Sequence, residues 1–287
     1  IPMMNDLPRN EAYLKALEAN VKKTTQVLEI GTGSGLLAMI AARCGAKRKV
    51  FTCEVVPTIA KMAKKIIKDN GYEDSISVLN KRSTEIEIGL DMPCKADVIV
   101  SEILSNEFLG EGVLETIEDA RSRLLAPGGK MIPDSGAIMF NLVGGDIFTK
   151  EYFIQNMFGF DLSSFNNIIS RKTSFTGSNS FKDMKKLDFF SDDMTAFSFE
   201  FNNHQRFSSE KVTLKVPIKK AGICSGIMQW IKLHLTSQIT FENHPKKQER
   251  QPSGWQPAVF LFDRPVQLEK GQVLSICAEH NCQVPLF

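Results

Sequence analysis

The chain lacks the features that mark membrane, zinc-binding and secreted disulfide proteins. No stretch approaches the roughly 18 consecutive apolar residues that a membrane span needs. No signal peptide is visible, and the first residue, Ile1, suggests that the true N-terminus lies upstream. The six cysteines contain no C-x-x-C pair, so we expect reduced thiols and no metal site. These absences favour a cytoplasmic and/or nuclear protein.

An excess of charge of one sign is also missing. The 35 basic and 33 acidic side chains give a net charge of only +2. The chain therefore has no strong field that would attract nucleic acid or a membrane surface, and we expect neither as a direct partner. With 287 residues, of which 43% are hydrophobic, the chain can form one large domain or two smaller ones with proper cores.

The two halves of the chain differ in their hydrophobic pattern. Short apolar strands alternate with helices up to about residue 140, which is typical of an α/β fold with a parallel, doubly wound sheet. The rest alternates with period two, most clearly over Thr195–Phe201, which predicts an antiparallel sandwich or barrel. We therefore predict one domain at 1–140 and a second at 141–287. Predicted helices are 10–21, 36–43, 58–69 and 112–125, and predicted strands are 27–30, 49–53, 76–79, 97–101 and a strand from 130.

One segment interrupts the second half. Residues 148–170 are rich in aromatic side chains and asparagine, which favours a projecting helical arm. An excursion with no partner would leave too many apolar groups in water, so we expect the arm to dock on a second module. The alternative is that these side chains fold back onto their own barrel. The apolar residues concerned are Tyr152, Phe153, Met157, Phe158 and Phe160.

A glycine-rich turn follows the first predicted strand and is the most informative local pattern. Gly31, Gly33 and Gly35 allow a sharp turn and a close approach to a ligand, with Thr32 between the first two. A dinucleotide fingerprint would need glycine at position 36, where Leu36 stands. The G-x-G-x-G spacing fits S-adenosylmethionine better than NAD. A tight turn without a ligand remains the alternative.

Acidic residues follow each of the next three predicted strands. Glu54, about 20 residues past the glycines, can accept hydrogen bonds from ribose hydroxyls, although an exposed strand-end carboxylate has the same pattern. Glu85 could accept a bond from an adenine amino group, or it could cap a helix. Glu102 follows the fourth strand, and its loop carries Glu107 and Glu111. Converging carboxylates repel one another unless a cation such as guanidinium lies between them, or unless the loop is solvated.

These motifs together resemble the catalytic core of the protein arginine methyltransferases. The segment Met4–Asn10 is similar to the helix motif whose arginine holds the carboxylate of the cofactor, which corresponds to Arg9. The segment 101–111 resembles the family's double-glutamate hairpin, whose two glutamates lie nine positions apart. That spacing selects Glu102 and Glu111 and leaves Glu107 as a bystander. The resemblance assigns Glu54 to the ribose and Glu85 to the adenine, and it includes Ser83 among the residues that bind the cofactor.

The resemblance implies a fold, a reaction and a partner. It implies a Rossmann-like S-adenosylmethionine-binding domain followed by a β-barrel-like domain with a helical dimerisation arm. The reaction would be methyl transfer from S-adenosyl-L-methionine to a protein arginine, with S-adenosyl-L-homocysteine as the product. Glu102 and Glu111 would hold the guanidinium, and Trp255 would form one side of the arginine slot. The chain would act as a homodimer or as a pseudo-dimer with a second module.

The branch of the family and the departures from its pattern bear on the product. Two segments, 79–85 and 108–112, are closest to the branch that makes monomethyl or symmetric dimethyl arginine. Gly254 stands where the family has the histidine of its Thr-His-Trp loop, which favours the monomethyl or symmetric dimethyl product. The alternative is that Gln251 or Gln256 takes the place of the histidine side chain and restores the usual product. The aromatic helix that usually precedes Met4 and covers the cofactor is not in this sequence.

Three other functions remain as alternatives. A methyltransferase for a small molecule fits the glycine turn equally well, although the long β-rich half argues against it. A non-catalytic scaffold module of a tandem enzyme would not need Arg9, Glu54, Glu102 and Glu111. A dinucleotide oxidoreductase is disfavoured by Leu36.

Overall fold

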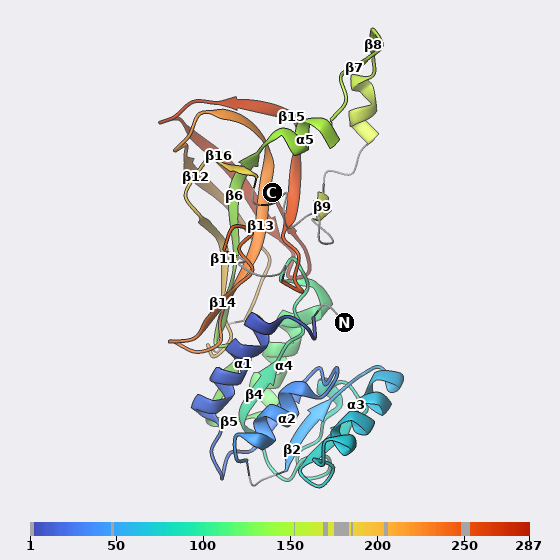
Figure 1. Cartoon of the computed structure of the whole chain (residues 1–287). Coiled ribbons are helices and arrows are strands. Elements are labelled where there is room, and N and C mark those ends of the chain that lie inside the picture. The colour runs from blue at the N-terminus through green and yellow to red at the C-terminus, as the bar shows by residue number, and fades with distance from the viewer. Residues whose placement is uncertain are drawn as a thin grey trace.

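The molecule consists of a parallel sheet with helices and a larger antiparallel assembly stacked on it (Figure 1). This computed structural model describes residues 3–46, 49–151, 153–168, 172–174, 184, 186–203, 206–247 and 253–287. The N-terminal segment lies between the two parts, and α1 (Leu7–Asn20) runs beside their junction (Figure 1). The predicted α/β fold with a following β-rich half is confirmed.

Within the described residues, the parallel sheet has five strands in the order β3-β2-β1-β4-β5. From β1 the chain adds β2 and β3 on one side of the sheet, and then β4 and β5 on the other side, so the strand order reverses between β1 and β4. Open α/β sheets bind ligands at such a reversal. The strands are β1 (Val27–Ile30), β2 (Val50–Cys53), β3 (Ile76–Leu79), β4 (Ala96–Ser101) and β5 (Leu125–Ile132).

Two predicted helix boundaries were wrong. Helix α1 begins at Leu7, not at Asn10, because Asp6 caps it by accepting a hydrogen bond from the Arg9 amide at 3.2 Å and Pro8 suits the first turn. Helix α4 (Val113–Arg123) ends before the Pro-Gly-Gly turn predicted to stop it, and that turn lies within β5. The other helices are α2 (Leu36–Arg43) and α3 (Pro57–Asp69), with short 3-10 helices η1 (Ser83–Glu85) and η2 (Gly110–Gly112).

The second half forms two antiparallel sheets that curl around a common core (Figure 1). In the described part of the chain, the larger has seven strands, with the path β10-β6-β13-β15-β9 and with β11 and β14 attached to β6 and β13. The smaller follows the order β12-β16-β17. The strands are β6 (Ser135–Gly144), β9 (Lys172–Ser174), β10 (Asp188–Phe189), β11 (Met194–Glu200), β12 (Glu210–Pro217), β13 (Gly222–His234), β14 (Thr240–Glu242), β15 (Ala258–Leu268), β16 (Val273–His280) and β17 (Pro285–Leu286).

The change from one sheet to the other falls between β5 and β6, so the predicted boundary at residue 140 lies inside β6. The predicted helical arm is helical only in part. It contains α5 (Asp146–Glu151), a hairpin of β7 (Asn156–Met157) and β8 (Phe160–Asp161), and the 3-10 helix η3 (Ser163–Ile168). The arm projects away from the barrel in Figure 1. Tyr152, which the arm prediction included, lies outside the described residues.

Candidate active site

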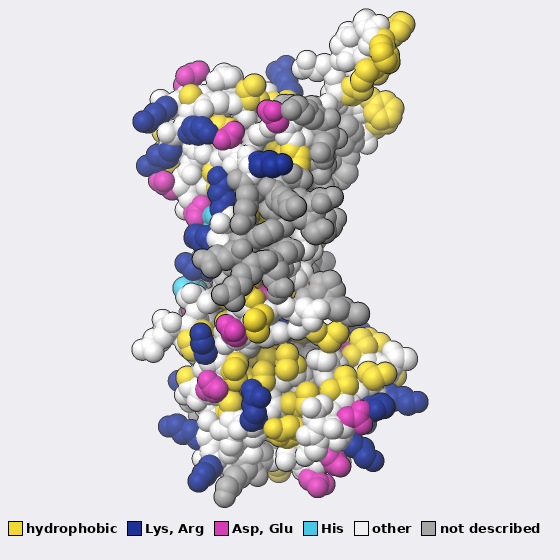
Figure 2. Space-filling view, in the orientation of Figure 1, with side chains coloured by type: hydrophobic (Ala, Val, Ile, Leu, Met, Phe, Trp, Pro, Cys, Tyr) yellow, Lys and Arg dark blue, Asp and Glu magenta, His cyan; other side chains and the backbone are white. Residues whose placement is uncertain are grey.

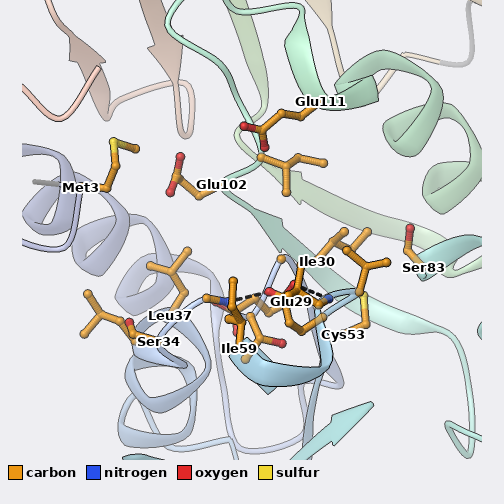
Figure 3. Close-up of a pocket in the computed structure, with 18 of the residues that line it drawn as sticks. Met3, Glu29, Ile30, Ser34, Leu37, Cys53, Ile59, Ser83, Glu102 and Glu111 are labelled. Atoms are coloured by element: carbon orange, nitrogen blue, oxygen red, sulfur yellow. Dashed lines mark hydrogen bonds between the residues drawn. The ribbon is translucent and has the colours of Figure 1, made fainter. Parts of the chain in front are cut away.

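A cavity of about 930 Å³ opens beside the carboxyl ends of β1 and β4, at the point where the strand order reverses. Figure 3 shows Glu29, Ile30 and Cys53 at one side of it and Glu102 and Glu111 at the other. Its volume lies in the range of about 300–1,000 Å³ that is typical of small-molecule sites. The cavity brings together residues from the glycine turn, α1 and the loop after β4.

The glycine turn has the conformation that a ligand cradle needs. Gly31, Gly33 and Gly35 have φ values of +87°, +51° and +80°, which other residues adopt only at a cost. A Cβ on Gly31 would lie 2.7 Å from the Ile103 side chain, whereas a Cβ on Gly33 would enter open space. Gly31, Thr32 and Gly33 line the cavity, and Gly35 caps the start of α2 behind them.

Glu54 lies next to this turn, as the sequence predicted. Its carboxylate accepts hydrogen bonds from the amides of Gly33 at 3.1 Å and Val56 at 2.9 Å, and the residue is 8% exposed. Each oxygen keeps a second lone pair for another donor. Glu54 therefore shapes the turn and also presents acceptors to the cavity, which fits the ribose hydroxyls of the expected cofactor.

Ser83 and Glu85, which were both predicted to bind the cofactor, differ in position: only Ser83 lines the cavity. Ser83 is buried and lines the cavity. Glu85 is exposed and is not among the cavity residues, because its carboxylate accepts the Arg82 amide at 3.1 Å and closes the start of η1. The geometry matches the alternative in which this acid is a helix cap.

Glu29 is a cavity residue that the sequence interpretation missed. It is 1% exposed, and its carboxyl accepts the Thr52 hydroxyl at 2.7 Å, which in turn is 2.6 Å from the Thr32 hydroxyl. Burial raises the pKa of the Glu29 carboxyl to about 8. A cationic group entering the cavity would favour its ionised form. The sequence signal that could have identified Glu29 is that it is an acid within the otherwise apolar strand β1.

Arg9 and Glu102 form an ion pair across the cavity. The Arg9 guanidinium lies 3.0 Å from the Glu102 carboxylate and also donates to the main-chain oxygen of Met3. Burial raises the pKa of the Glu102 carboxyl to about 7; Arg9 opposes this rise, and Glu111 adds to it. Arg9 therefore partly neutralises an acid that is otherwise costly to ionise.

The loop that carries Glu102 and Glu111 is anchored at its centre. Phe108 is fully buried in the barrel, 5.0 Å from the Phe199 ring. The Ser105 hydroxyl accepts the Gly110 amide at 2.9 Å and so closes the turn. Glu111 has a φ of +64°, a strained value for a non-glycine residue, which aims its side chain into the cavity opposite Glu102 (Figure 3).

Trp255 lies behind Arg9 and does not line the cavity. It is 1% exposed, and the Arg9 guanidinium is centred 5.3 Å from its ring. Its indole N–H donates to the Leu104 oxygen at 2.9 Å, so it is fixed to the loop that carries Glu102. Trp255 contacts Arg9 in this structure, and its expected place at one side of the arginine slot stays a prediction. Among the described residues, no cluster of His, Cys, Asp and Glu could hold a metal ion, and no helix is long and apolar enough to cross a membrane.

Two family models match the chain. Residues 10–141 match the model described as ribosomal protein L11 methyltransferase. Residues 137–283, about half of the chain, match the model described as arginine methyltransferase oligomerization subdomain. The two matches meet near the change from the parallel to the antiparallel sheet.

Curated relatives match nearly the whole chain. It is 34% identical over 279 residues to an arginine N(omega)-methyltransferase of Streptomyces achromogenes subsp. streptozoticus, with 96% of this chain and 73% of that protein covered. It is 30% identical over 317 residues to protein arginine N-methyltransferase 7 of Oryza sativa subsp. indica, with 98% of this chain and 43% of that protein covered. The chain thus spans less than half the length of the plant relative.

Solved structures share the fold. An enzyme–prozyme heterotetrameric complex of Trypanosoma brucei PRMT1 with AdoHcy superposes with a TM-score of 0.81 at 24% identity, covering 96% of this chain and 86% of that chain. Protein arginine methyltransferase 10 of Arabidopsis thaliana, in an open conformation, gives a TM-score of 0.77 at 20% identity with the same coverage. At these identities the likeness supports the architecture.

Proposed function

Because this chain belongs to the protein arginine methyltransferase family, we propose that it transfers a methyl group from S-adenosyl-L-methionine to the guanidino group of arginine in protein substrates. One observation carries the proposal. Glu102 and Glu111 converge on the same cavity that contains the glycine turn and Glu54. A site that combines a nucleoside cradle with two carboxylates suits a cofactor and a guanidinium.

The residues present fit the cofactor. Gly33 leaves room for a close approach of the ligand, Glu54 would offer acceptors to its ribose, and Ser83 would also contact it. Arg9 would hold its carboxylate, and Glu29 would face its amino group. When bound, the cofactor supplies an electrophilic methyl group. Glu85, which was also predicted to bind the cofactor, is exposed and does not line the cavity.

The chain's own residues then prepare the arginine. Free guanidinium is a poor nucleophile because its charge is delocalised. Glu102 and Glu111 would accept its N–H groups bidentately, orient one nitrogen toward the methyl group and stabilise the positive charge in a cavity with little water. Glu102 must be ionised for this, and Arg9 assists by opposing the rise in its pKa.

We propose monomethyl or symmetric dimethyl arginine as the product. Gly254 lies against Met3, and a Cβ there would be 2.8 Å from the Met3 Cα, so no larger side chain fits at this place in the loop. Gln256 is tied to Ser253 and Asn106 by hydrogen bonds of 3.2 and 3.0 Å, and Gln251 lies outside the described residues. Fragmentation mass spectrometry distinguishes the dimethyl isomers, and dominant asymmetric product would contradict the proposal.

A second candidate is the methylation of free arginine. The Streptomyces relative is named an arginine methyltransferase without mention of a protein substrate, and the chain covers 73% of it. A competition assay with labelled methyl donor, an Arg-Gly peptide and free L-arginine separates the two. Label in the peptide supports the first candidate, label in free arginine supports the second, and label in neither contradicts both.

We also propose that the arm mediates association with a second copy or a second module. The matched oligomerization subdomain and the exposed aromatic side chains at the arm tip support this proposal. Figure 2 shows apolar side chains at the projecting tip. Phe158 and Phe160 are 92% and 71% exposed.

A further inference from the structure

Asp6 connects the first turn of α1 with the loop that carries Trp255. Its carboxylate is 2% exposed and accepts three hydrogen bonds. One oxygen accepts the Arg9 amide at 3.2 Å, and the other accepts the Ser253 hydroxyl at 2.6 Å and the Gly254 amide at 2.7 Å. The same side chain therefore fixes the start of α1 and a loop almost 250 positions later in the chain.

We propose that Asp6 and Ser253 are positioning residues that couple cofactor binding at Arg9 to the placement of Trp255 and of the loop carrying the two catalytic glutamates. The inference rests on the proposed function, because it assumes that the cofactor binds beside Arg9. Asp6 and Ser253 would thus have a role in the reaction although neither residue lines the cavity.

The contact between Met3 and Gly254 makes this junction rigid. A Cβ on Gly254 would lie 2.5 Å from the Met3 sulfur and 3.2 Å from its main-chain nitrogen. The main chain of Met3 therefore packs directly on the loop, and Met3 also lines the cavity. A shift of the segment before α1 would therefore change its contact with the loop at Gly254.

Further hydrogen bonds continue the connection from the loop to the catalytic acids. The Ser253 hydroxyl that donates to Asp6 also accepts the Trp255 amide at 3.2 Å. The Trp255 indole donates to Leu104 at 2.9 Å, and the Gln256 amide donates to Asn106 at 3.0 Å. Leu104 and Asn106 lie in the loop between Glu102 and Glu111. A series of hydrogen bonds thus runs from the first turn of α1 to the loop that carries both acids.

The first experiment measures the coupling without requiring methyl transfer. The chain has two tryptophans, so the Trp230→Phe protein retains Trp255 as its only indole fluorophore. S-adenosyl-L-homocysteine should change the Trp255 fluorescence in this background, because it binds Arg9, which lies on the Trp255 ring. Adding Ser253→Ala or Asp6→Asn should reduce this change at saturating ligand, because Trp255 then loses its hydrogen-bonded link to Asp6 while its contact with Arg9 remains. An undiminished change in both variants would overturn the inference.

The second experiment uses the natural two-tryptophan chain and separates positioning from folding. Ser253→Ala should weaken the binding of S-adenosyl-L-homocysteine, measured by calorimetry, because a coupling between two sites acts in both directions. It should also lower kcat/KM for the arginine substrate about tenfold, the size expected for losing a hydrogen bond to a charged group. Ser253→Thr keeps the hydroxyl and should restore the rate. Ser191→Ala, which removes a hydroxyl bonded to Asn141 elsewhere in the barrel, should retain the full rate.

The outcomes distinguish this inference from the proposed function. If the natural chain methylates neither peptide nor free arginine, the proposed function fails, and the fluorescence experiment still decides the coupling. If it is active and Ser253→Ala is equally active, the positioning role is wrong. If Ser253→Ala lowers the thermal midpoint and the rate, but threonine does not rescue the rate, the contact is structural only and the inference also fails.

Discussion

The parallel-sheet half and the antiparallel half contribute to the site in different ways. The first supplies every residue that lines the cavity, from the ends of its parallel strands, the loops after them and the helices beside them. The second supplies Phe199, against which Phe108 packs, and Trp255, which holds Leu104. The first half therefore carries the chemistry and the second fixes its geometry. Changes to cavity residues should affect rate and cofactor affinity directly, whereas changes to the barrel should act through position or assembly.

The largest effect is expected from the two acids that would hold the guanidinium. Glu102→Gln and Glu111→Gln keep the shape and remove a charge opposite a desolvated cation, a loss of about 3–5 kcal/mol that reduces transfer by more than about a hundredfold. Binding of S-adenosyl-L-homocysteine, measured by calorimetry, should persist in both variants.

The matched control is Glu107→Gln, which changes the same loop between the two acids. It should retain most of the rate, because Glu107 is not among the residues that line the cavity. If Glu107 proved essential and Glu111 dispensable, the assignment based on the nine-residue spacing would be wrong.

A smaller effect is expected at the cofactor end. Glu54→Ala should weaken binding of S-adenosyl-L-homocysteine about ten- to a hundredfold, because it removes an acceptor worth about 1.5–3 kcal/mol. Glu54→Gln, which keeps one acceptor oxygen for the turn, should weaken it less. Glu85→Ala should leave the affinity unchanged, since Glu85 is not among the residues that line the cavity and its carboxylate accepts the Arg82 amide. Equal losses at Glu54 and Glu85 would contradict the separation seen in the structure.

The acids that would hold the guanidinium and the residues at the cofactor end also show what the sequence can predict. The alternation of strands and helices, the glycine turn and the acids at Glu54, Glu102 and Glu111 were predictable, because strand ends and fixed spacings are local patterns. The position of Glu85 was not, because an acid that closes a short helix has the same pattern as one that meets a ligand.

Long-range contacts set the second limit on prediction. The role of Asp6 depends on Ser253, and the burial of Trp255 depends on Arg9 and Leu104. No pattern within either segment records these pairings, because they arise only when the barrel packs on the parallel-sheet half. Glu29 was missed for a different reason: the first strand was used only to recognise the glycine turn, and its acid was given no role in the site.

The pH dependence should sharpen the assignment of Glu102. Its carboxyl has a pKa of about 7 and must be ionised to hold a guanidinium. The rate should therefore rise from pH 6 to pH 8 with a midpoint of about 7, and each unit below the midpoint should lower it about tenfold. Glu29, with a pKa of about 8, titrates in an overlapping range. The Glu29→Gln protein at saturating cofactor should keep the midpoint of about 7; a profile flat across this range would contradict the assignment.

The smallest effect on the chemistry itself is expected from the arm, which belongs to the second half and projects at the end of the molecule opposite the parallel sheet (Figure 1). Phe158→Ser combined with Phe160→Ser should convert an associated form into single chains in sedimentation, because these rings are 92% and 71% exposed and would be covered only by a partner. The thermal midpoint should change little, since exposed side chains add little to the fold's own core. Leu90→Ser is the matched control: this side chain is 76% exposed on the parallel-sheet half, and its loss should leave sedimentation as it was. If the doubly substituted arm sediments as the natural chain does, the arm is not the contact between modules, and its aromatic tip needs another explanation.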